Sequence, residues 1–230
     1  MILHIPHSGT DTLGYPIKIE DINRGTDWFT DSLFEHVSAN KIIQRVSRFI
    51  VDCERLPDDI EPMFNDGYGI VYQKDFDGND FQFEKDVEYL KGIYNEHHKN
   101  LNIATNKALC YFDHVFVVDC HSFGKEQKES DVDICFGHNP DFTEFTLLSK
   151  LINYCKDYNL TVGLNNPYSN AIVPSNHIGN KNVTSIMIEV NKRLYLTDDY
   201  NRNHNFDNIK HIINNLLDII SKKEDYYNGI

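Results

Sequence analysis

The element that decides the fold is the stretch VFVVDCHS, which occupies residues 115–122. Its four leading apolar residues, Val115 to Val118, are typical of a strand that is buried on both faces of a sheet. Such a strand has no structural need to end in Asp-Cys-His-Ser. Asp119 and His121 share one face of the extended chain, because side chains alternate with a period of two. The stretch therefore predicts a central strand with polar chemistry at its carboxyl end.

Strand-like and helix-like segments alternate on both sides of this run. Strands are expected over 2–5, 41–46, 48–53, 131–136, 160–164 and 184–190, and helices over 28–37, 81–109, 142–158 and 206–220. The polar stretch 56–72 has the length and composition of an active-site loop. The pattern predicts a single domain over residues 1–230, an α/β three-layer sandwich around a central mixed, largely parallel sheet. In such sheets, ligands bind beyond the carboxyl ends of the strands.

The charge and the cysteines exclude several classes of protein. The formal net charge is -13, with 22 basic against 35 acidic residues, which argues against nucleic-acid and anionic-membrane binding. A small anionic substrate stays compatible, because a few buried arginines can make a positive pocket. The odd number of cysteines and the lack of a C-x-x-C pair favour free thiols in a cytoplasmic protein. No apolar run is long enough for a membrane span, and residues 2–6 do not resemble a signal peptide.

The end of the first expected strand carries two histidines in the sequence HIPHSG, residues 4–9. On an extended segment, His4 and His7 point to opposite faces, so at most one is expected to serve a shared site. His7 is favoured because it lies at the strand exit, beside Ser8 and Gly9. A turn histidine without a metal is the alternative interpretation.

A carboxylate interrupts the apolar strand 184–190. Glu189 lies between Ile188 and Val190 and shares a face with Asn191. A buried glutamate at such a place either pairs with an arginine or transfers protons. Burial is expected to raise its pKa.

Further polar candidates have a structural alternative each. Arg48 and Arg55 bracket the expected strand 48–53 and could bind a carboxylate with their planar forks, or could be surface arginines. Asp27 suits an N-cap of the helix expected at 28–37. Asp119 either orients a neighbouring histidine or caps a turn.

Seven short segments together resemble the N-formylglutamate amidohydrolase family, whose fold is similar to that of zinc carboxypeptidases. They occur in the family's order and cover roughly residues 2–200: Pro6-His7-Ser8-Gly9, Thr26-Asp27-Trp28, Ser47 to Asp52 with Arg55, His98, Asp119-Cys120-His121-Ser122, His177-Ile178-Gly179, and Glu189 with Tyr195. Two places depart from the family's pattern. Glu54-Arg55-Leu56 stands where Asn-Arg-Pro is frequent, and Ser169-Asn170-Ala171 lacks the basic residue of the corresponding family stretch.

The resemblance implies zinc-dependent hydrolysis of an N-acyl amide, with N-formyl-L-glutamate, a small carboxylate-bearing molecule, as the leading substrate. It implies one zinc ion per chain, a water activated by that zinc, and the following roles: His7, Asp27 and His121 as metal ligands; Glu189 as general base and His177 as an assisting residue; Arg48, Arg55 and Asn191 as substrate contacts; Asp119, Asp52 and His98 as supports of the site. Two alternatives stay open: a carboxypeptidase-like hydrolase of short peptides or cell-wall fragments, and a catalytically inactive binding module of the same fold.

Overall fold

The computed structural model describes residues 1–124 and 131–229, and its centre is a six-stranded sheet in the order β2-β1-β3-β6-β4-β5. The strands are β1 (Ile2–Ile5), β2 (Asn40–Ile43), β3 (Val115–Phe123), β4 (Ile134–Gly137), β5 (Val162–Leu164) and β6 (Val183–Asn191). All neighbouring strands run parallel except β4 and β6, which are antiparallel. The prediction of a mixed, largely parallel sheet is confirmed.

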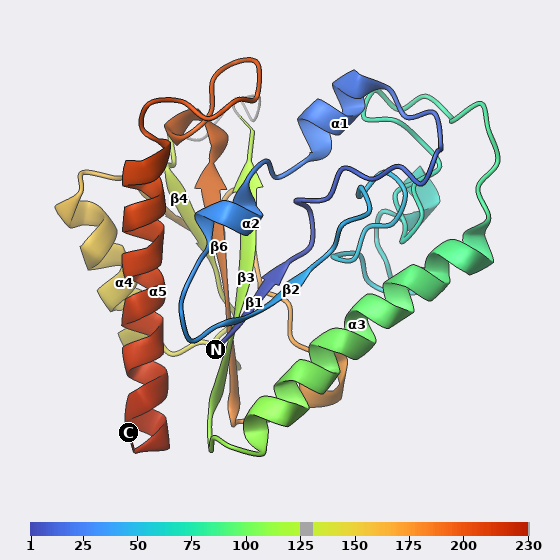
Figure 1. The fold of residues 1–230 in the computed structure, drawn as a ribbon. Coiled ribbons are helices and arrows are strands. Elements are labelled where there is room, and N and C mark those ends of the chain that lie inside the picture. Colours follow the sequence, from blue (N-terminus) through green and yellow to red (C-terminus); the bar gives the residue numbers. More distant parts are fainter. Residues whose placement is uncertain (125–130, 230) are drawn as a thin grey trace.

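Helices cover both faces of this sheet. α3 (Val87–Leu109) lies along one face, while α4 (Phe145–Asp157) and α5 (Phe206–Asn228) lie along the other (Figure 1). The short helices are α1 (Ile19–Gly25), α2 (Thr30–Leu33), η1 (Phe64–Asp66), η2 (Ser175–His177) and η3 (Lys192–Leu194). The result is the three-layer sandwich that the alternation of segments predicted. Among the helices that the structure describes, none is long and apolar enough to cross a membrane.

The two faces of β3 differ in chemistry. Phe116, Val118 and Cys120 pack in the large apolar core with α4 and α5. Val115 and Val117 point the other way and pack with residues of α3. Because the alternation continues along the strand, Asp119 and His121 follow on the α3 face. Polar side chains of the central strands are thereby collected between the sheet and α3.

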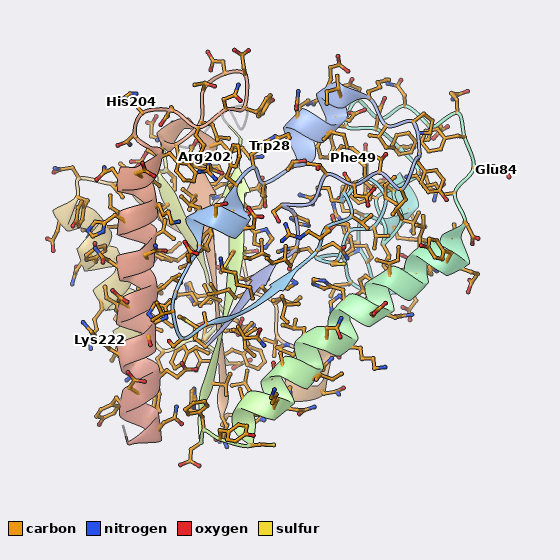
Figure 2. The ribbon with its side chains drawn as sticks, in the orientation of Figure 1. Trp28, Phe49, Glu84, Arg202, His204 and Lys222 are labelled. Atoms are coloured by element: carbon orange, nitrogen blue, oxygen red, sulfur yellow. The ribbon has the colours of Figure 1, made fainter. Side chains whose placement is uncertain are left out.

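The segment 48–53, expected as a strand, forms turns instead. Ile50 N donates to Ser47 O at 2.8 Å, as in a tight turn. Ile50 and Val51 are nevertheless fully buried, because they pack in a small core with residues of α3 rather than in the sheet. Phe49 lies in this loop region, away from the sheet (Figure 2). The apolar run 48–53 therefore reflects burial against α3 and not membership of the sheet, so the prediction of a strand here is wrong.

The helix expected over 28–37 shrinks to the four residues of α2. Phe29 has φ 62°, a left-handed conformation that no α-helix continues through, and Phe34 is extended. Phe29 and not Asp27 is the N-cap residue, so the proposed capping role of Asp27 is wrong. The carboxylate of Asp27 is therefore free for other partners.

Candidate metal centre

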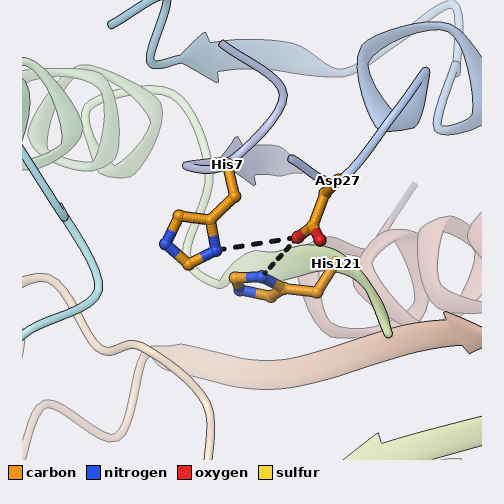
Figure 3. Close-up of side chains that lie close together, drawn as sticks. All are labelled: His7, Asp27 and His121. Atoms are coloured by element: carbon orange, nitrogen blue, oxygen red, sulfur yellow. Dashed lines mark hydrogen bonds and ion pairs between the residues drawn. The ribbon is translucent and has the colours of Figure 1, made fainter. Parts of the chain in front are cut away.

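Two histidines and one aspartate meet above the carboxyl ends of the central strands. His121 Nδ1 lies 3.3 Å and His7 Nδ1 lies 3.6 Å from Asp27 Oδ2 (Figure 3). The three side chains are almost completely buried, and the two rings lie 5.0 Å apart between centroids. One ligand atom from each residue falls within 4.8 Å of the others, so the three could share one metal ion.

Three separate parts of the chain supply these residues. His7 follows β1, His121 lies near the carboxyl end of β3, and Asp27 follows α1. The backbone N of Asp27 donates to His7 O at 2.9 Å, which fixes the two loops to each other. Thr30 Oγ1 donates to Asp27 O at 2.8 Å and holds the start of α2 against the same residue. The site therefore depends on backbone contacts as well as on side chains.

Each histidine ring is oriented by a second carboxylate. His7 Nε2 lies 2.7 Å from Asp52 Oδ1, and His121 Nε2 lies 2.9 Å from Asp119 Oδ1. These contacts turn Nε2 of both rings toward a carboxylate and Nδ1 toward Asp27, so that with the proton on Nε2 each Nδ1 lone pair would be available to a metal ion. Metal-binding histidines are commonly held in this way. The expected supporting positions of Asp52 and Asp119 agree with this geometry.

The charge and the hydrogen bonding of the site also fit a cation. His7 Nδ1 is a buried polar atom that has no hydrogen-bond partner within residues 1–124 and 131–229. Burial alone would lower the pKa of His121, but the carboxylates around it, Asp119 first, raise it well above its usual range. The surroundings thus favour positive charge at this place. Two imidazole nitrogens and a carboxylate oxygen are the donor set of many catalytic zinc sites.

Asp52 joins the histidine to the two arginines. Its Oδ2 accepts from Arg48 NH2 at 2.7 Å and from Tyr72 OH at 2.5 Å, and Arg55 Nε lies 3.6 Å away. Burial would raise the pKa of Asp52, but Arg48, His7 and Arg55 hold it well below its usual range. The carboxylate that orients His7 therefore also positions both candidate substrate-binding arginines.

Glu189, on β6, lies next to His121, on the neighbouring strand β3. The two residues are paired in register between β3 and β6, so period-two alternation puts both on the α3 face. Glu189 is 6% exposed, its Oε2 has no hydrogen-bond partner among the residues that the structure describes, and burial raises its pKa to about 8. A carboxylate in this state suits proton transfer near neutral pH.

A cavity of about 240 Å³ opens over this centre. Its lining comprises His7, Asp27, Arg48, Glu54, Arg55, His121, Ser122, Tyr168, Ser169, Met187 and Glu189. A second cavity of about 330 Å³ shares Asp27 and both arginines and adds Arg24, Tyr72 and Lys192. The candidate base, metal ligands and arginines thus face connected space that is large enough for a small molecule.

Three of the predicted site residues lie elsewhere. In α3, His97 contacts His4, whereas the neighbouring His98 turns its Nε2 to Cys53 O at 3.0 Å. Asn191 uses both ends of its amide on backbone, donating to Val132 O and accepting from Arg193 N, which caps η3. His177 is buried in η2 and partners Asn180, and it is not among the described residues that line the two cavities. None of these three residues is among the described residues that line the two cavities, and His98 lies beside His97 with ring centroids 5.8 Å apart.

Three residues of the site were missed from the sequence. His4 is fully buried, and its Nδ1 lies 2.8 Å from Asp119 Oδ1; of the two N-terminal histidines, His7 is the one that groups with Asp27 and His121. Glu54 and Lys192 also reach the site, and Lys192 Nζ lies 3.6 Å from Asp27 Oδ1. The position of Lys192 directly after a strand that carries a buried glutamate was the available signal.

The class of this protein follows from where its ligands lie. Two histidines and buried carboxylates are gathered at the carboxyl ends of parallel strands in a three-layer α/β sandwich, which defines an α/β enzyme with a candidate metal centre. The model of the N-formylglutamate amidohydrolase family matches residues 1–196, and the chain belongs to that family.

Solved structures share the fold. The N-formylglutamate amidohydrolase from Ralstonia eutropha JMP134 superposes with a TM-score of 0.84 at 22% identity, over 100% of this chain and 94% of that chain. A gene product of Agrobacterium tumefaciens superposes with a TM-score of 0.63 at 20% identity, over 97% of this chain and 91% of that chain. No curated protein matches the sequence.

Proposed function

We propose that this protein hydrolyses the amide bond of an N-acyl amino acid in a metal-dependent reaction, with N-formyl-L-glutamate as the leading substrate and formate and L-glutamate as products. The observation that carries the proposal is the convergence of His7 Nδ1 and His121 Nδ1 on Asp27, beside the buried carboxyl of Glu189. Membership of the N-formylglutamate amidohydrolase family supports the choice of substrate. The relative from Ralstonia eutropha carries the same name and supports it too.

His7, Asp27 and His121 would hold one zinc ion, which suits this donor set. When bound, zinc lowers the pKa of a water molecule toward about 7 and polarises the amide carbonyl. Glu189 accepts a proton from the attacking water and delivers it to the amine nitrogen as the C–N bond breaks. Its buried carboxyl, with a pKa of about 8 before the metal's charge is added, is suited to hold and release that proton.

Arg48 and Arg55 would bind the carboxylates of the substrate. Both line the cavity over the metal ligands, and each keeps a buried Nε without a hydrogen-bond partner. Guanidinium groups are suited to carboxylates because two parallel N–H groups match two oxygens. Lys192 adds a buried cation to the neighbouring cavity. Positive side chains inside an acidic protein thus favour an anionic substrate.

The cysteines support a reducing compartment. All five are free. Disulfide bonds are frequent in proteins secreted into an oxidising environment and are rare in the reducing cytosol. We therefore place the reaction in the cytoplasm.

The direct test is formate release by the purified protein. We expect N-formyl-L-glutamate to be cleaved after reconstitution with zinc, and not after treatment with a chelator. N-formyl-L-leucine serves as the matched substrate control, because it keeps the formyl amide and lacks the second carboxylate. Cleavage of short peptides without formate release would favour the carboxypeptidase-like alternative. Zinc binding without hydrolysis of either substrate class would favour the inactive binding module.

A further inference from the structure

A second group of potential ligands lies beside the first. His4, Glu54 and Asp119 place one ligand atom each within 4.8 Å of one another. His4 Nδ1 lies 2.8 Å from Asp119 Oδ1 and 3.3 Å from Glu54 Oε1. Ligands that share a tetrahedral zinc ion with bonds of about 2.0–2.2 Å lie roughly 3.3–3.6 Å apart. The separation of His4 Nδ1 and Glu54 Oε1 therefore matches that of two ligands of one metal ion, whereas the separation of His4 Nδ1 and Asp119 Oδ1 is that of a hydrogen bond.

The hydrogen bonding of this group is incomplete. Glu54 Oε1 is a buried atom without a hydrogen-bond partner, although His4 Nδ1 is only 3.3 Å away. His4 Nδ1 can form one hydrogen bond, and the short distance of 2.8 Å shows that its partner is Asp119 Oδ1 rather than Glu54. Burying an ionised carboxylate oxygen that has the rings of His4 at 3.3 Å and His121 at 3.8 Å but no well-formed hydrogen bond is costly. A cation between the three side chains would satisfy all of them at once.

The ring of His4 is held as a ligand would be held. Its Nε2 lies 2.8 Å from His97 Nε2 in the middle of α3. Burial lowers the pKa of His97 to about 2, so this ring stays neutral and can accept a hydrogen bond from His4 Nε2–H. That bond leaves His4 Nδ1 to face Glu54 and Asp119. The arrangement parallels the one in which Asp52 holds His7 Nε2 and frees its Nδ1.

We propose that His4, Glu54 and Asp119 form a second divalent-metal site, separate from His7, Asp27 and His121, for zinc or an ion of similar preference for nitrogen and oxygen ligands. One imidazole and two carboxylates make a mixed donor set that suits zinc better than magnesium or calcium. Glu54 lines the cavity over the first centre, which gives an ion a route of entry.

The second site is coupled to the first through Asp119. Its Oδ1 accepts from His121 Nε2 at 2.9 Å and is also the atom nearest to His4 Nδ1. Its Oδ2 accepts from Ile172 N at 3.1 Å, which keeps the carboxylate in place. An ion on Asp119 would weaken that carboxylate as an acceptor for His121. Occupation of the second site should therefore change the affinity of the first for zinc.

A proton on His4 is the competing explanation for the same cluster. Burial lowers the pKa of His4, but Asp119 and Glu54 together raise it to about 9. An imidazolium would neutralise part of the acidic charge without any metal. Metal stoichiometry separates the two explanations, because a protonated ring excludes a metal from Nδ1.

The test is the number of zinc ions per chain in the full-length protein, measured by equilibrium dialysis against zinc and elemental analysis. We expect about two for the native protein, about one for Glu54→Gln and about one for His7→Ala. Glu54→Gln keeps the size of the side chain and removes its charge, and circular dichroism verifies that each variant is folded. His98→Gln is the matched control and should retain both ions, because the side chain of His98 has its described hydrogen bond with Cys53 O and not with a proposed ligand atom.

Binding of about one zinc ion by the native protein at saturating zinc would overturn the proposal and assign a proton to His4. Two ions in Glu54→Gln would overturn it as well. Neither result depends on catalysis. Two bound ions without formate release would contradict the proposed function alone, whereas one bound ion with full formate release would contradict the second site alone.

Discussion

At the scale of single residues, the site consists of histidines whose two ring nitrogens have different partners. His7 and His121 turn Nε2 to Asp52 and Asp119, and both turn Nδ1 to Asp27. Without the outer carboxylates, each ring could rotate or change its tautomer. The buried carboxylates are therefore as important to the centre as the candidate ligands.

Glu189→Gln tests the proposed base. The amide has nearly the same shape but cannot accept a proton, so kcat for formate release should fall by about 10²–10⁴-fold while zinc content stays unchanged. Steady-state kinetics and elemental analysis of the same preparation measure both quantities. Turnover within a few fold of the native enzyme would remove Glu189 from this role.

Asp52→Asn tests the support of His7 and the arginines. Loss of the charge should weaken zinc binding by about 10–100-fold, since the amide holds His7 Nε2 less firmly. KM should rise in parallel, because Arg48 and Arg55 lose their common partner. Isothermal titration with zinc and the kinetics of formate release are the measurements. Glu61→Gln is a suitable control, because Glu61 contacts Arg55 but not His7.

Asp52 also predicts how stability depends on pH in the metal-free protein. Its pKa in the folded state lies well below the usual value of about 3.9, so its stabilising contribution is present above pH 4. That contribution is lost as the pH falls below about 4, since the unfolded chain then binds the proton more readily. Urea unfolding at a series of pH values should show a smaller acid loss in Asp52→Asn. Identical pH profiles would contradict this assignment.

At the scale of elements, α3 connects the sheet to the site. Its residues Leu101 and Ala104 pack under β3, while His97 reaches His4 and Tyr94 OH donates to Arg55 O. The helix begins where Asp86 accepts a hydrogen bond from Tyr89 N at 3.1 Å. The periodic pattern predicted the helix, but its start at 81 was six residues too early by comparison with Val87.

Asp86→Ala tests that helix start. Loss of an N-cap of this kind costs about 0.5–2 kcal/mol of folding free energy. We expect a decrease in that range in chemical denaturation, with kcat and KM unchanged under native conditions, because Asp86 is far from the ligands in the chain and exposed. Lys99→Ala, an exposed change within the same helix, should have little effect.

At the scale of the whole molecule, the sheet separates a structural face from a functional face. α4 and α5 cover an apolar core, whereas α3 and the loop region 48–80 lie on the other side of the sheet, where His97 of α3 contacts His4 (Figure 1). The parallel strands bring the carboxyl ends of β1, β3 and β6 to one edge. Ligands from distant parts of the chain therefore meet there.

Leu216→Ala and Leu101→Ala form a matched pair that tests this separation. Both leucines are fully buried, Leu216 on α5 and Leu101 on α3. Each substitution should lower the unfolding free energy by about 2–5 kcal/mol through the cavity that it leaves. Only Leu101→Ala should also weaken zinc binding, because it loosens the helix that holds His97. Equal effects on zinc affinity, measured by titration, would contradict the separation.

Much of this arrangement could be predicted from the sequence. The alternation along 115–122 set the buried strand and placed Asp119 and His121 on one face, and the same rule placed Glu189. The order of short motifs indicated the family and the pairing of His7 with His121. These features depend on local geometry and on residue types, which the sequence contains directly.

Only the tertiary structure decided which polar residues share a site. The segment 48–53 looks like a strand, because its apolar residues are buried, but the contacts that bury them come from α3 and not from a neighbouring strand. The family resemblance indicates His98, whereas His97 contacts His4. Neighbouring residues on a helix point about 100° apart, so the orientation of α3 determines which ring meets His4. Lys192 reaches the site because it begins the short helix η3 directly after β6. Glu54 reaches it from a turn of the loop region 48–80. Sequence specifies periodicity and chemistry along the chain, whereas contacts between distant segments depend on how whole elements pack against one another.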